Sequence, residues 1–425
     1  MPLTLALRQV ATLAVVALTA CASPPATTPQ PLAAPAVAAA SAAGASLDEL
    51  AMQQGFDRWV AGFMASARAS GVDDATLHQA FDGARYVARA VDADRKQPEF
   101  TRAVWDYVDL IVSPARVQRG QGKLAQFQDE LSAPEARYGV PRATIVAIWG
   151  MESDYGANYG DIPTIDALAT LGFEGRREAW ARQQLMAALK ILQSGDIDRA
   201  HMIGSWAGAM GQTQFLPSAF LSFAVDADGD GRRDIWGSLA DVAASTANFL
   251  ARSGWQPGQA WGTEVRLPDG FDAARADDTL RQTSAQWAGE GVRAIDGSPL
   301  PELADAAILL PAGVRGPAFL VGPNFRVILR YNNATSYALA VSLLAQRIAG
   351  GAGVQADWPK DLAPLSREQV KALQSALNGR GFDAGAPDGQ PGPATSRALR
   401  AYQRTLGLPA DGFPTQDLLN RLQAP

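Results

Sequence analysis

Residues 141–153, Pro-Arg-Ala-Thr-Ile-Val-Ala-Ile-Trp-Gly-Met-Glu-Ser, decide both the fold and the chemistry expected of this chain. Pro141 suits the first position of a helix, where its missing N–H costs nothing. Ile145, Ile148 and Glu152 recur at helical spacing, which predicts an apolar helix with the acid on its buried face. Burial keeps a carboxyl group protonated near neutral pH, as cleavage of a glycosidic bond requires. A capped or salt-bridged surface acid is the alternative that this segment leaves open.

The size and charge of the whole chain limit the classes of protein it can belong to. With 425 residues, 47% of them hydrophobic, the chain is long enough for more than one domain and for a sizeable core. Its net charge of −6 argues against a general nucleic-acid binder, because a basic surface would be needed for that role. We therefore expect no nucleic-acid partner, and we expect a monomer.

The N-terminus has the pattern expected of a secretion signal. Arg8 precedes an apolar stretch from Val10 to Ala20 that is too short to span a bilayer as a helix. The stretch ends in Leu-Thr-Ala-Cys21, which resembles a bacterial lipoprotein signal. The resemblance implies that residues 1–20 are removed and that Cys21 is acylated. An ordinary signal peptide with an incidental cysteine is the alternative. Cys21 is the single cysteine of the sequence, so a disulfide within the chain is excluded.

Residues 21–46 are almost wholly Ala, Pro, Thr and Ser. Such a composition cannot bury a core and predicts a flexible tether behind the lipidated cysteine. Ala22 after the cysteine resembles the pattern that sorts lipoproteins to the outer membrane. We therefore expect a protein anchored through Cys21 at the periplasmic face of the outer membrane of a Gram-negative bacterium.

From residue 47 onward the hydrophobic pattern is mainly helical. Apolar residues three and four apart predict helices within 47–50, 56–69, 74–81 and 176–192, whereas strand-like patterns occur mainly at 318–321 and 325–329. Gly350-Gly351-Ala352-Gly353 and two later prolines break the pattern and suggest a hinge. We predict a mainly α domain over 47–349, a linker over 350–363 and a small separate domain over 364–425.

The small domain contains an internal repeat. Asp388-Gly389 is followed by Thr395, and Asp411-Gly412 is followed by Thr415. Each Asp-Gly suits a tight turn, and each Thr is expected to cap a helix. This unit resembles the peptidoglycan-binding domain, a three-helix module, and we assign it binding without chemistry. A helical module with another ligand is the alternative.

Three further segments of the large domain favour a sugar-binding cleft. The run 204–215, Gly-Ser-Trp-Ala-Gly-Ala-Met-Gly-Gln-Thr-Gln-Phe, is rich in small residues that let backbone approach a bulky ligand. Its Ser205 and Gln214 offer uncharged partners for sugar hydroxyl and N-acetyl groups. The runs 323–325 and 330–337 add aromatic rings and amides, a combination found in concave ligand sites.

These segments, in this order over about residues 50–349, resemble the lytic murein transglycosylase B family. The resemblance implies a lysozyme-like α core with flanking helical parts and a small strand element, and Glu152 as the sole catalytic acid and base. At Phe249 a family member has tyrosine, so the ring is kept and the hydroxyl is lost. The residues implied to line the cleft are Tyr107, Ser205, Gln214, Phe215, Phe249, Tyr331, Asn332 and Tyr337.

An acidic run predicts a Ca²⁺ site. Carboxylates occupy the first, third, fifth and ninth positions of an EF-hand-like loop that starts at Asp226, with glycine at the sixth. Gly237 stands where the usual Glu would be, and in the resembled family a later acid, here Asp241, closes the loop. An acidic turn without tightly bound metal is the alternative. We expect bound Ca²⁺ to brace the cleft, and no cofactor for the chemistry. The candidate ligands are Asp226, Asp228, Asp230, Asp234 and Asp241.

The number of carboxylates determines the expected reaction. Most glycosidases use two, whereas Asp154, two residues beyond Glu152, would point elsewhere. With one acid, the resemblance implies cleavage of the MurNAc-β-1,4-GlcNAc bond of peptidoglycan, with the C6 hydroxyl of MurNAc as nucleophile and a 1,6-anhydroMurNAc end as product. Two alternatives remain open. One is a lysozyme-type muramidase, and the other is a non-catalytic lipoprotein that tethers the cell wall.

Overall fold

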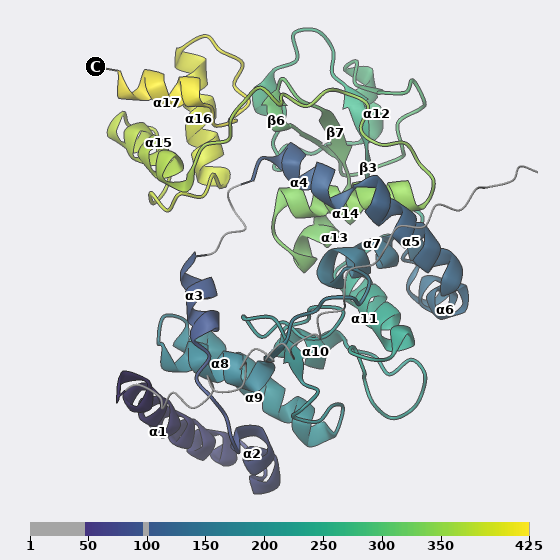
Figure 1. Cartoon of the computed structure of the whole chain (residues 1–425). Helices are drawn as coiled ribbons and strands as arrows, with labels where there is room; N and C mark the ends of the chain where they lie inside the picture. Colours follow the sequence, from purple (N-terminus) through teal and green to yellow (C-terminus); the bar gives the residue numbers. More distant parts are fainter. Residues whose placement is uncertain (1–46, 97–101, 425) are drawn as a thin grey trace, which may run out of the picture. The chain divides into compact units, whose positions relative to one another are not determined.

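The structure is a computed structural model that describes residues 47–96 and 102–424. The predicted signal peptide, Cys21 and the tether lie outside the described residues. In the described part, the chain is mainly helical with small antiparallel sheets (Figure 1), which confirms the predicted fold class. Across the same residues, every helix is too short or too polar to cross a lipid bilayer.

The helices of the large domain account for most of its described residues. The first nine are α1 (Leu47–Ala69), α2 (Asp74–Phe81), α3 (Ala88–Lys96), α4 (Val104–Ile111), α5 (Pro114–Gln126), α6 (Gln128–Tyr138), α7 (Arg142–Ser153), α8 (Thr164–Phe173) and α9 (Glu178–Ser194). The later ones are α10 (Pro217–Phe223), α11 (Leu239–Arg252), the short 3-10 helix η2 (Ala273–Arg275), α12 (Ser284–Gly289), α13 (Pro323–Tyr331) and α14 (Thr335–Ile348). The helices predicted at 47–50, 56–69, 74–81 and 176–192 correspond to α1, α2 and α9.

Helix α7 lies inside this domain. It packs against α5, α6, α11 and α14 (Figure 1). Every residue from Thr144 to Gly150 is buried, because the sequence is apolar around the whole circumference of the helix. Pro141 is the residue just before the helix, one position earlier than expected. Residues 145–149 therefore lie in the main hydrophobic core.

The strands form two small antiparallel sheets. The first pairs β1 (Ile162–Pro163) with β2 (Ile203–Gly204), with Ile162 opposite Gly204. The second has the order β4-β3-β7-β5 and a core of its own around Trp287. Its strands are β3 (Gly262–Arg266), β4 (Arg293–Ala294), β5 (Ala307–Leu309) and β7 (Ala318–Val321), and β6 (Pro311–Val314) lies beside β5 in the sequence.

Of the two predicted strands, 318–321 is correct and 325–329 is wrong. The latter belongs to α13, which begins at Pro323, a favourable residue for the first helical turn. Phe325 and Ile328 are buried three residues apart, while Arg326 and Arg330 lie on the more exposed side. The β-branched run resembled a strand, but the charges follow a helical period.

The C-terminal residues fold into three helices around a separate hydrophobic core. They are α15 (Arg367–Gly379), α16 (Pro393–Thr405) and α17 (Gln416–Gln423). The internal repeat is visible in the hydrogen bonds. Gln374 bonds the Asp388-Gly389 turn, and Gln403 bonds the Asp411-Gly412 turn in the same way.

The two repeated threonines play different roles in this domain. Thr415 caps α17, as expected, because its hydroxyl accepts from the N–H of Leu418. Thr395 is not a cap. It lies inside α16, where its buried hydroxyl accepts from the Gln374 amide, because Gly392 and Pro393 begin that helix one turn earlier.

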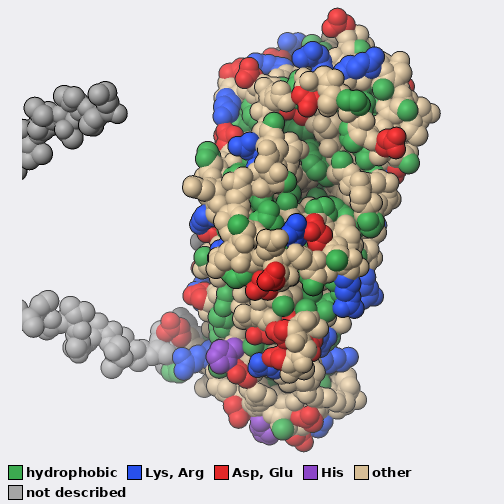
Figure 2. Space-filling model, turned by 90° about the vertical axis from the view of Figure 1, so that its right-hand side faces the viewer, with side chains coloured by type: hydrophobic (Ala, Val, Ile, Leu, Met, Phe, Trp, Pro, Cys, Tyr) green, Lys and Arg blue, Asp and Glu red, His purple; other side chains and the backbone are tan. Residues whose placement is uncertain are grey.

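Several contacts hold the linker to the large domain, among them ion pairs of Lys360 with Asp109 at 2.6 Å and of Asp361 with Arg315 at 3.0 Å. The Glu264 side chain, buried on β3, accepts the backbone N–H groups of Gln355 and Ala356, each at 2.8 Å. This differs from the expectation of a free hinge. The surface seen in Figure 2 carries interspersed acidic and basic side chains, in keeping with the small net charge.

Candidate active site

Glu152 lies in the last turn of α7 and is half-buried. The helix ends directly after it, because Asp154 and Tyr155 both adopt left-handed backbone angles, with φ of 51° and 62°. Such angles are costly for residues other than glycine and are found mainly at functional sites. The turn fixes where the final residues of α7 point, and Glu152 is among them.

Tyr155 explains why glycine precedes Met151 in this motif. The turn brings the Tyr155 ring back against α7, at 5.8 Å and 90° from the Trp149 ring. A Cβ at Gly150 would lie 2.5 Å from the Tyr155 ring, so any larger residue would push the turn away. The Tyr155 hydroxyl donates to the carbonyl of Arg116 at 2.8 Å, and burial raises its pKa to about 12.

Asp154 points away from the position of a second catalytic acid, as predicted. Its two carboxylate oxygens accept from Arg119 at 2.9 and 2.6 Å, and Arg116 lies 3.5 Å away. This bidentate ion pair balances the charge of the carboxylate and holds it against α5. Asp154 therefore does not form a carboxylate pair with Glu152.

Tyrosine side chains surround Glu152 instead. The Tyr337 hydroxyl, on α14, donates a hydrogen bond to Oε1 of Glu152. Burial raises the pKa of Tyr337 well above its usual value, and the charge of Glu152 adds to this, so Tyr337 remains a donor. Tyr107 on α4 and Tyr331 on α13 lie close enough to this pair to affect it electrostatically. The structure thus brings together four of the residues predicted from sequence.

An aromatic cluster packs against Tyr331. The rings of Phe215 and Phe249 lie 5.8 and 4.7 Å from that of Tyr331. Both phenylalanines are buried, so their rings position Tyr331 and offer little surface to a ligand. The Tyr331 hydroxyl donates to the carbonyl of Thr213 at 2.7 Å, which connects α13 to the 204–215 segment.

The small residues of the 204–215 segment pack against the protein's own backbone. A Cβ at Gly204 would lie 1.9 Å from the carbonyl oxygen of Ala209, and one at Gly211 would lie 2.6 Å from that of Ile235. This differs from the expected close approach to a ligand. The glycines allow the segment to fold tightly onto itself and onto the loop before α11.

The polar residues of the same segment hold its shape. The Ser205 hydroxyl accepts from the N–H of Ala209 at 3.1 Å. Gln214 has a left-handed φ of 52°, and its amide donates to the carbonyls of Tyr159 and Gly211 at 2.9 Å. Both side chains are half-buried. Asn332, by contrast, is exposed at the end of α13. Gln212, which the sequence analysis did not assign a role, bonds directly to α7.

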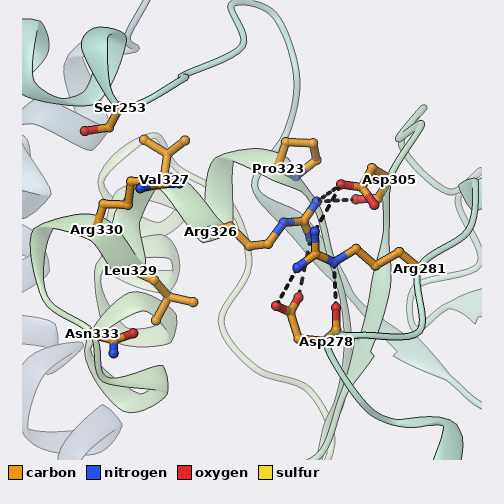
Figure 3. A pocket seen from close by; sticks show the side chains of 10 residues that line it. All are labelled: Ser253, Asp278, Arg281, Asp305, Pro323, Arg326, Val327, Leu329, Arg330 and Asn333. Atoms are coloured by element: carbon orange, nitrogen blue, oxygen red, sulfur yellow. Dashed lines mark hydrogen bonds and ion pairs between the residues drawn. The ribbon is translucent and has the colours of Figure 1, made fainter.

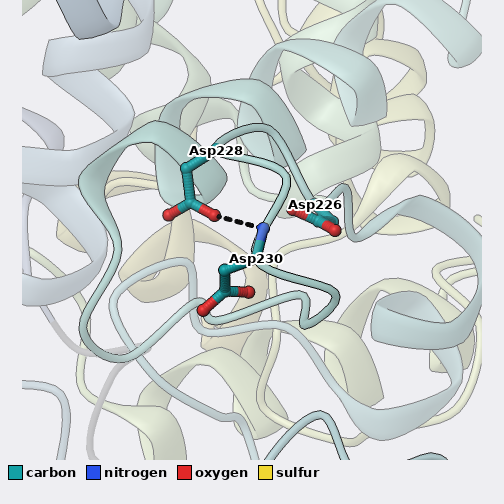
Figure 4. A group of neighbouring side chains, drawn as sticks. All are labelled: Asp226, Asp228 and Asp230. Carbon is teal, nitrogen blue, oxygen red and sulfur yellow. Dashed lines mark hydrogen bonds between the residues drawn. The ribbon is translucent and has the colours of Figure 1, made fainter.

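Three of the five predicted metal ligands lie together. Figure 4 shows Asp226, Asp228 and Asp230, which can each bring a carboxylate oxygen within 4.8 Å of the others. Asp234 and Asp241 are outside this group. Asp234 accepts the N–H groups of Trp236 and Gly237.

Asp241 closes the acidic loop from inside the protein. Its fully buried carboxylate accepts the N–H groups of Ala227 and Asp234, both at 2.7 Å. Burial raises the pKa of Asp241 despite these bonds. Asp241 therefore joins the two ends of the loop through the backbone.

A separate cavity of about 640 Å³ lies between α13 and the segments next to the larger sheet. Figure 3 shows that four of its charged residues, Asp278, Arg281, Asp305 and Arg326, pair with one another. Arg326 donates to Asp305 at 2.5 Å, and Arg281 donates to Asp278 at 2.9 Å. Its lining does not include Glu152 or the tyrosines around it.

Comparisons with known proteins agree with this geometry. Residues 55–346 match the family described as the transglycosylase SLT domain, and residues 366–422 match the putative peptidoglycan binding domain. The membrane-bound lytic murein transglycosylase B of Escherichia coli (strain K12) is 34% identical over 262 residues, which cover 60% of this chain and 70% of that protein.

Two solved structures are similar over most of their length. SltB3 from Pseudomonas aeruginosa, in complex with NAG-anhNAM-pentapeptide, is 52% identical with a TM-score of 0.84, over 87% of this chain and 99% of that one. The Escherichia coli lytic transglycosylase Slt35, in complex with calcium, is 30% identical with a TM-score of 0.58, over 71% and 94%.

The family match and these relatives define an enzyme of the lytic transglycosylase class. More particularly, the chain belongs to the transglycosylase SLT domain family, because the family match covers well over half of it. The resemblances seen in both the large domain and the C-terminal domain are thereby confirmed.

Proposed function

We propose that this enzyme cleaves the MurNAc-β-1,4-GlcNAc bond of peptidoglycan and leaves a 1,6-anhydroMurNAc end, with Glu152 as the catalytic acid and then base. The observation that carries the proposal is the site itself. Glu152 receives a hydrogen bond from Tyr337, while the neighbouring Asp154 is neutralised by Arg119. The ligand of SltB3, NAG-anhNAM-pentapeptide, has the same kind of anhydro end.

The reaction needs one carboxyl group because the substrate supplies its own nucleophile. Glu152 donates its proton to the glycosidic oxygen as the bond from that oxygen to C1 of MurNAc breaks. The bonding electron pair leaves with the GlcNAc oxygen, and the N-acetyl group of MurNAc stabilises the positive charge at C1. The ionised Glu152 then takes the proton of the C6 hydroxyl, whose oxygen bonds to C1. No water is consumed, and proximity of the internal nucleophile supplies much of the rate.

Substitution of the acid tests this proposal. Glu152→Gln keeps the shape of the side chain but cannot transfer a proton, so cleavage of purified sacculi should fall by at least about a hundredfold. Binding to sacculi and thermal unfolding should remain close to those of the wild type. A variant that still releases muropeptides at the wild-type rate would remove Glu152 from the mechanism.

The products separate this proposal from its alternatives. A muramidase leaves a reducing end, which is heavier than the anhydro end by one water, and mass spectrometry resolves the two. A wall-tethering lipoprotein without activity would leave sacculi intact with either wild type or Glu152→Gln.

The location proposed for the enzyme is the periplasmic face of the outer membrane, with acylated Cys21 as the anchor. The lipoprotein-like residues 18–21 support this, and the Escherichia coli relative is membrane-bound by name. Cys21→Ala should release the protein from the membrane fraction into the periplasm. Persistence of the variant in washed membranes would argue against a lipid anchor.

Ca²⁺ is proposed as a structural ion of the acidic loop. The residues fit such an ion in part, because Asp226, Asp228 and Asp230 supply hard oxygen ligands that converge. Asp234 and Asp241 bond backbone N–H groups instead, so they brace the loop around the ion. The related Slt35 was solved with calcium. A bound ion would fix the loop next to the 204–215 segment and would take no part in proton transfer.

A further inference from the structure

Both polar atoms of the Gln212 side-chain amide make hydrogen bonds. The indole N–H of Trp149 donates to its Oε1 at 2.8 Å, and its Nε2 donates to the carbonyl of Trp236 at 2.6 Å. Its backbone N–H donates to the carbonyl of Ile235 at 2.8 Å. One amide therefore connects the catalytic helix to the end of the acidic loop.

Each of the two partners is itself firmly held. Trp149 lies one helical turn before Glu152 on α7, is buried, and packs edge-on against Phe127 and Tyr155. Trp236 is also buried, and its indole N–H donates to the carbonyl of Ile203 at 2.9 Å. Because both tryptophans are closely packed, a shift of the Gln212 amide would move α7 as well.

The turn after Glu152 is also fitted to this amide. A Cβ at Gly156 would lie 2.4 Å from Oε1 of Gln212, and Gly156 has a left-handed φ of 83°. Gln212 thus contacts the catalytic helix before Glu152 and the backbone turn after it.

We propose that Gln212 is a positioning residue that sets the orientation of Glu152 through Trp149 and Gly156 and ties it to residues 235–236 of the acidic loop. Glutamine suits this position because its amide oxygen can accept from an indole N–H while its amide nitrogen donates to a carbonyl. In this role Gln212 does not contact the reacting atoms. The inference rests on the proposed role of Glu152.

The test uses the full chain with a double-mutant cycle. Gln212→Met keeps the length of the side chain and removes both hydrogen bonds, and Trp149→Phe removes the indole N–H. Turnover of defined glycan fragments gives kcat and KM for each single variant and for the double variant. Gln184→Met is the matched control, because Gln184 is a buried glutamine on α9 that accepts from the N–H of Ser218, away from α7.

We expect kcat of Gln212→Met to fall at least about tenfold with KM changed less than about twofold, since small misplacements of catalytic groups cost rate more than binding. The double variant should lose clearly less than the two single losses combined, because both variants remove the hydrogen bond between Trp149 and Gln212. Gln184→Met should lower the melting temperature while leaving kcat within about twofold of the wild type, the margin expected when no catalytic group moves.

Equal losses of kcat in Gln212→Met and Gln184→Met would reduce Gln212 to a purely structural role and overturn the proposal. Fully additive effects of the two single variants would do the same. A Glu152→Gln enzyme with wild-type turnover, by contrast, would refute the proposed function before any variant of Gln212 is considered.

Discussion

The carboxyl group of Glu152 accepts a hydrogen bond from Tyr337, which lies 185 positions later in the chain. The motif around Glu152 is visible in the sequence, and so is its helix. The hydrogen bond from Tyr337 arises only because α14 packs along α7. The family resemblance implied a substrate contact for Tyr337, whereas in the structure its hydroxyl donates to Glu152.

Removal of that hydroxyl should therefore reduce turnover. Tyr337→Phe loses the hydrogen bond to the carboxylate that forms as Glu152 gives up its proton, a bond to a charged group worth about 1.5–3 kcal/mol, so we expect kcat to fall by about 10- to 100-fold with KM little changed. Steady-state kinetics on defined glycan fragments measures both quantities.

Tyr86→Phe is the matched control, because the Tyr86 hydroxyl also donates to a glutamate, Glu174, outside the site. This variant should lose stability but keep kcat. If the two variants showed the same kcat, the Tyr337 hydroxyl would have no special role in catalysis.

Among the elements, the acidic loop shows most clearly which features follow from sequence spacing and which follow from tertiary packing. The spacing of Asp226, Asp228 and Asp230 is evident in the sequence, and these residues converge as expected. The sequence suggested the same ligand role for Asp241. In the structure its buried carboxylate bonds two backbone N–H groups instead.

Calcium should stabilise this loop measurably. At a hundredfold excess over Kd, a ligand bound by the folded state alone adds about 2.7 kcal/mol, so the melting temperature should rise by several degrees relative to protein in EDTA. Asp228→Asn should reduce or abolish that rise, because it removes one charged ligand. Differential scanning calorimetry measures the shift.

Asp383→Asn provides the control for this experiment. Asp383 makes a similar turn bond, to the N–H of Gly385, but lies in the C-terminal domain. Its variant should keep the full calcium response. Identical melting of the wild type in calcium and in EDTA would leave the loop as an acidic turn.

At the scale of the whole molecule, the linker is part of the large domain at Gln355 and Ala356. Their backbone N–H groups satisfy the buried carboxylate of Glu264. The glycines at 350–353 led to the expectation of a hinge, and no local pattern indicated that Glu264, 91 positions before Gln355, would hold the following residues in place.

Truncations on either side of this contact should therefore differ. A chain that ends at residue 363 keeps the contact and should melt close to the intact large domain. A chain that ends at residue 349 leaves a buried carboxylate without its donors and also loses the ion pairs of Lys360 and Asp361, so it should lose at least about 3 kcal/mol of unfolding free energy. Urea unfolding of both truncated chains gives the comparison.

Glu264→Leu supplies the check on the cause. In the chain that ends at 349 this substitution should recover part of the loss, because the unsatisfied carboxylate is gone. Equal stability of the two truncated chains would show that the bonds to Glu264 contribute nothing.

The amino-acid sequence by itself determined the helical fold class and the resemblance of its two parts to known families, and it singled out Glu152 as the candidate acid. These follow from hydrophobic periodicity and from short motifs, in which the interacting residues lie within one or two turns of each other. Only the tertiary structure decided that Tyr337 bonds Glu152, that Gln212 connects Trp149 to Trp236, and that Glu264 holds the linker. Such contacts join residues tens to hundreds of positions apart, so they depend on how whole helices pack, which local patterns do not encode.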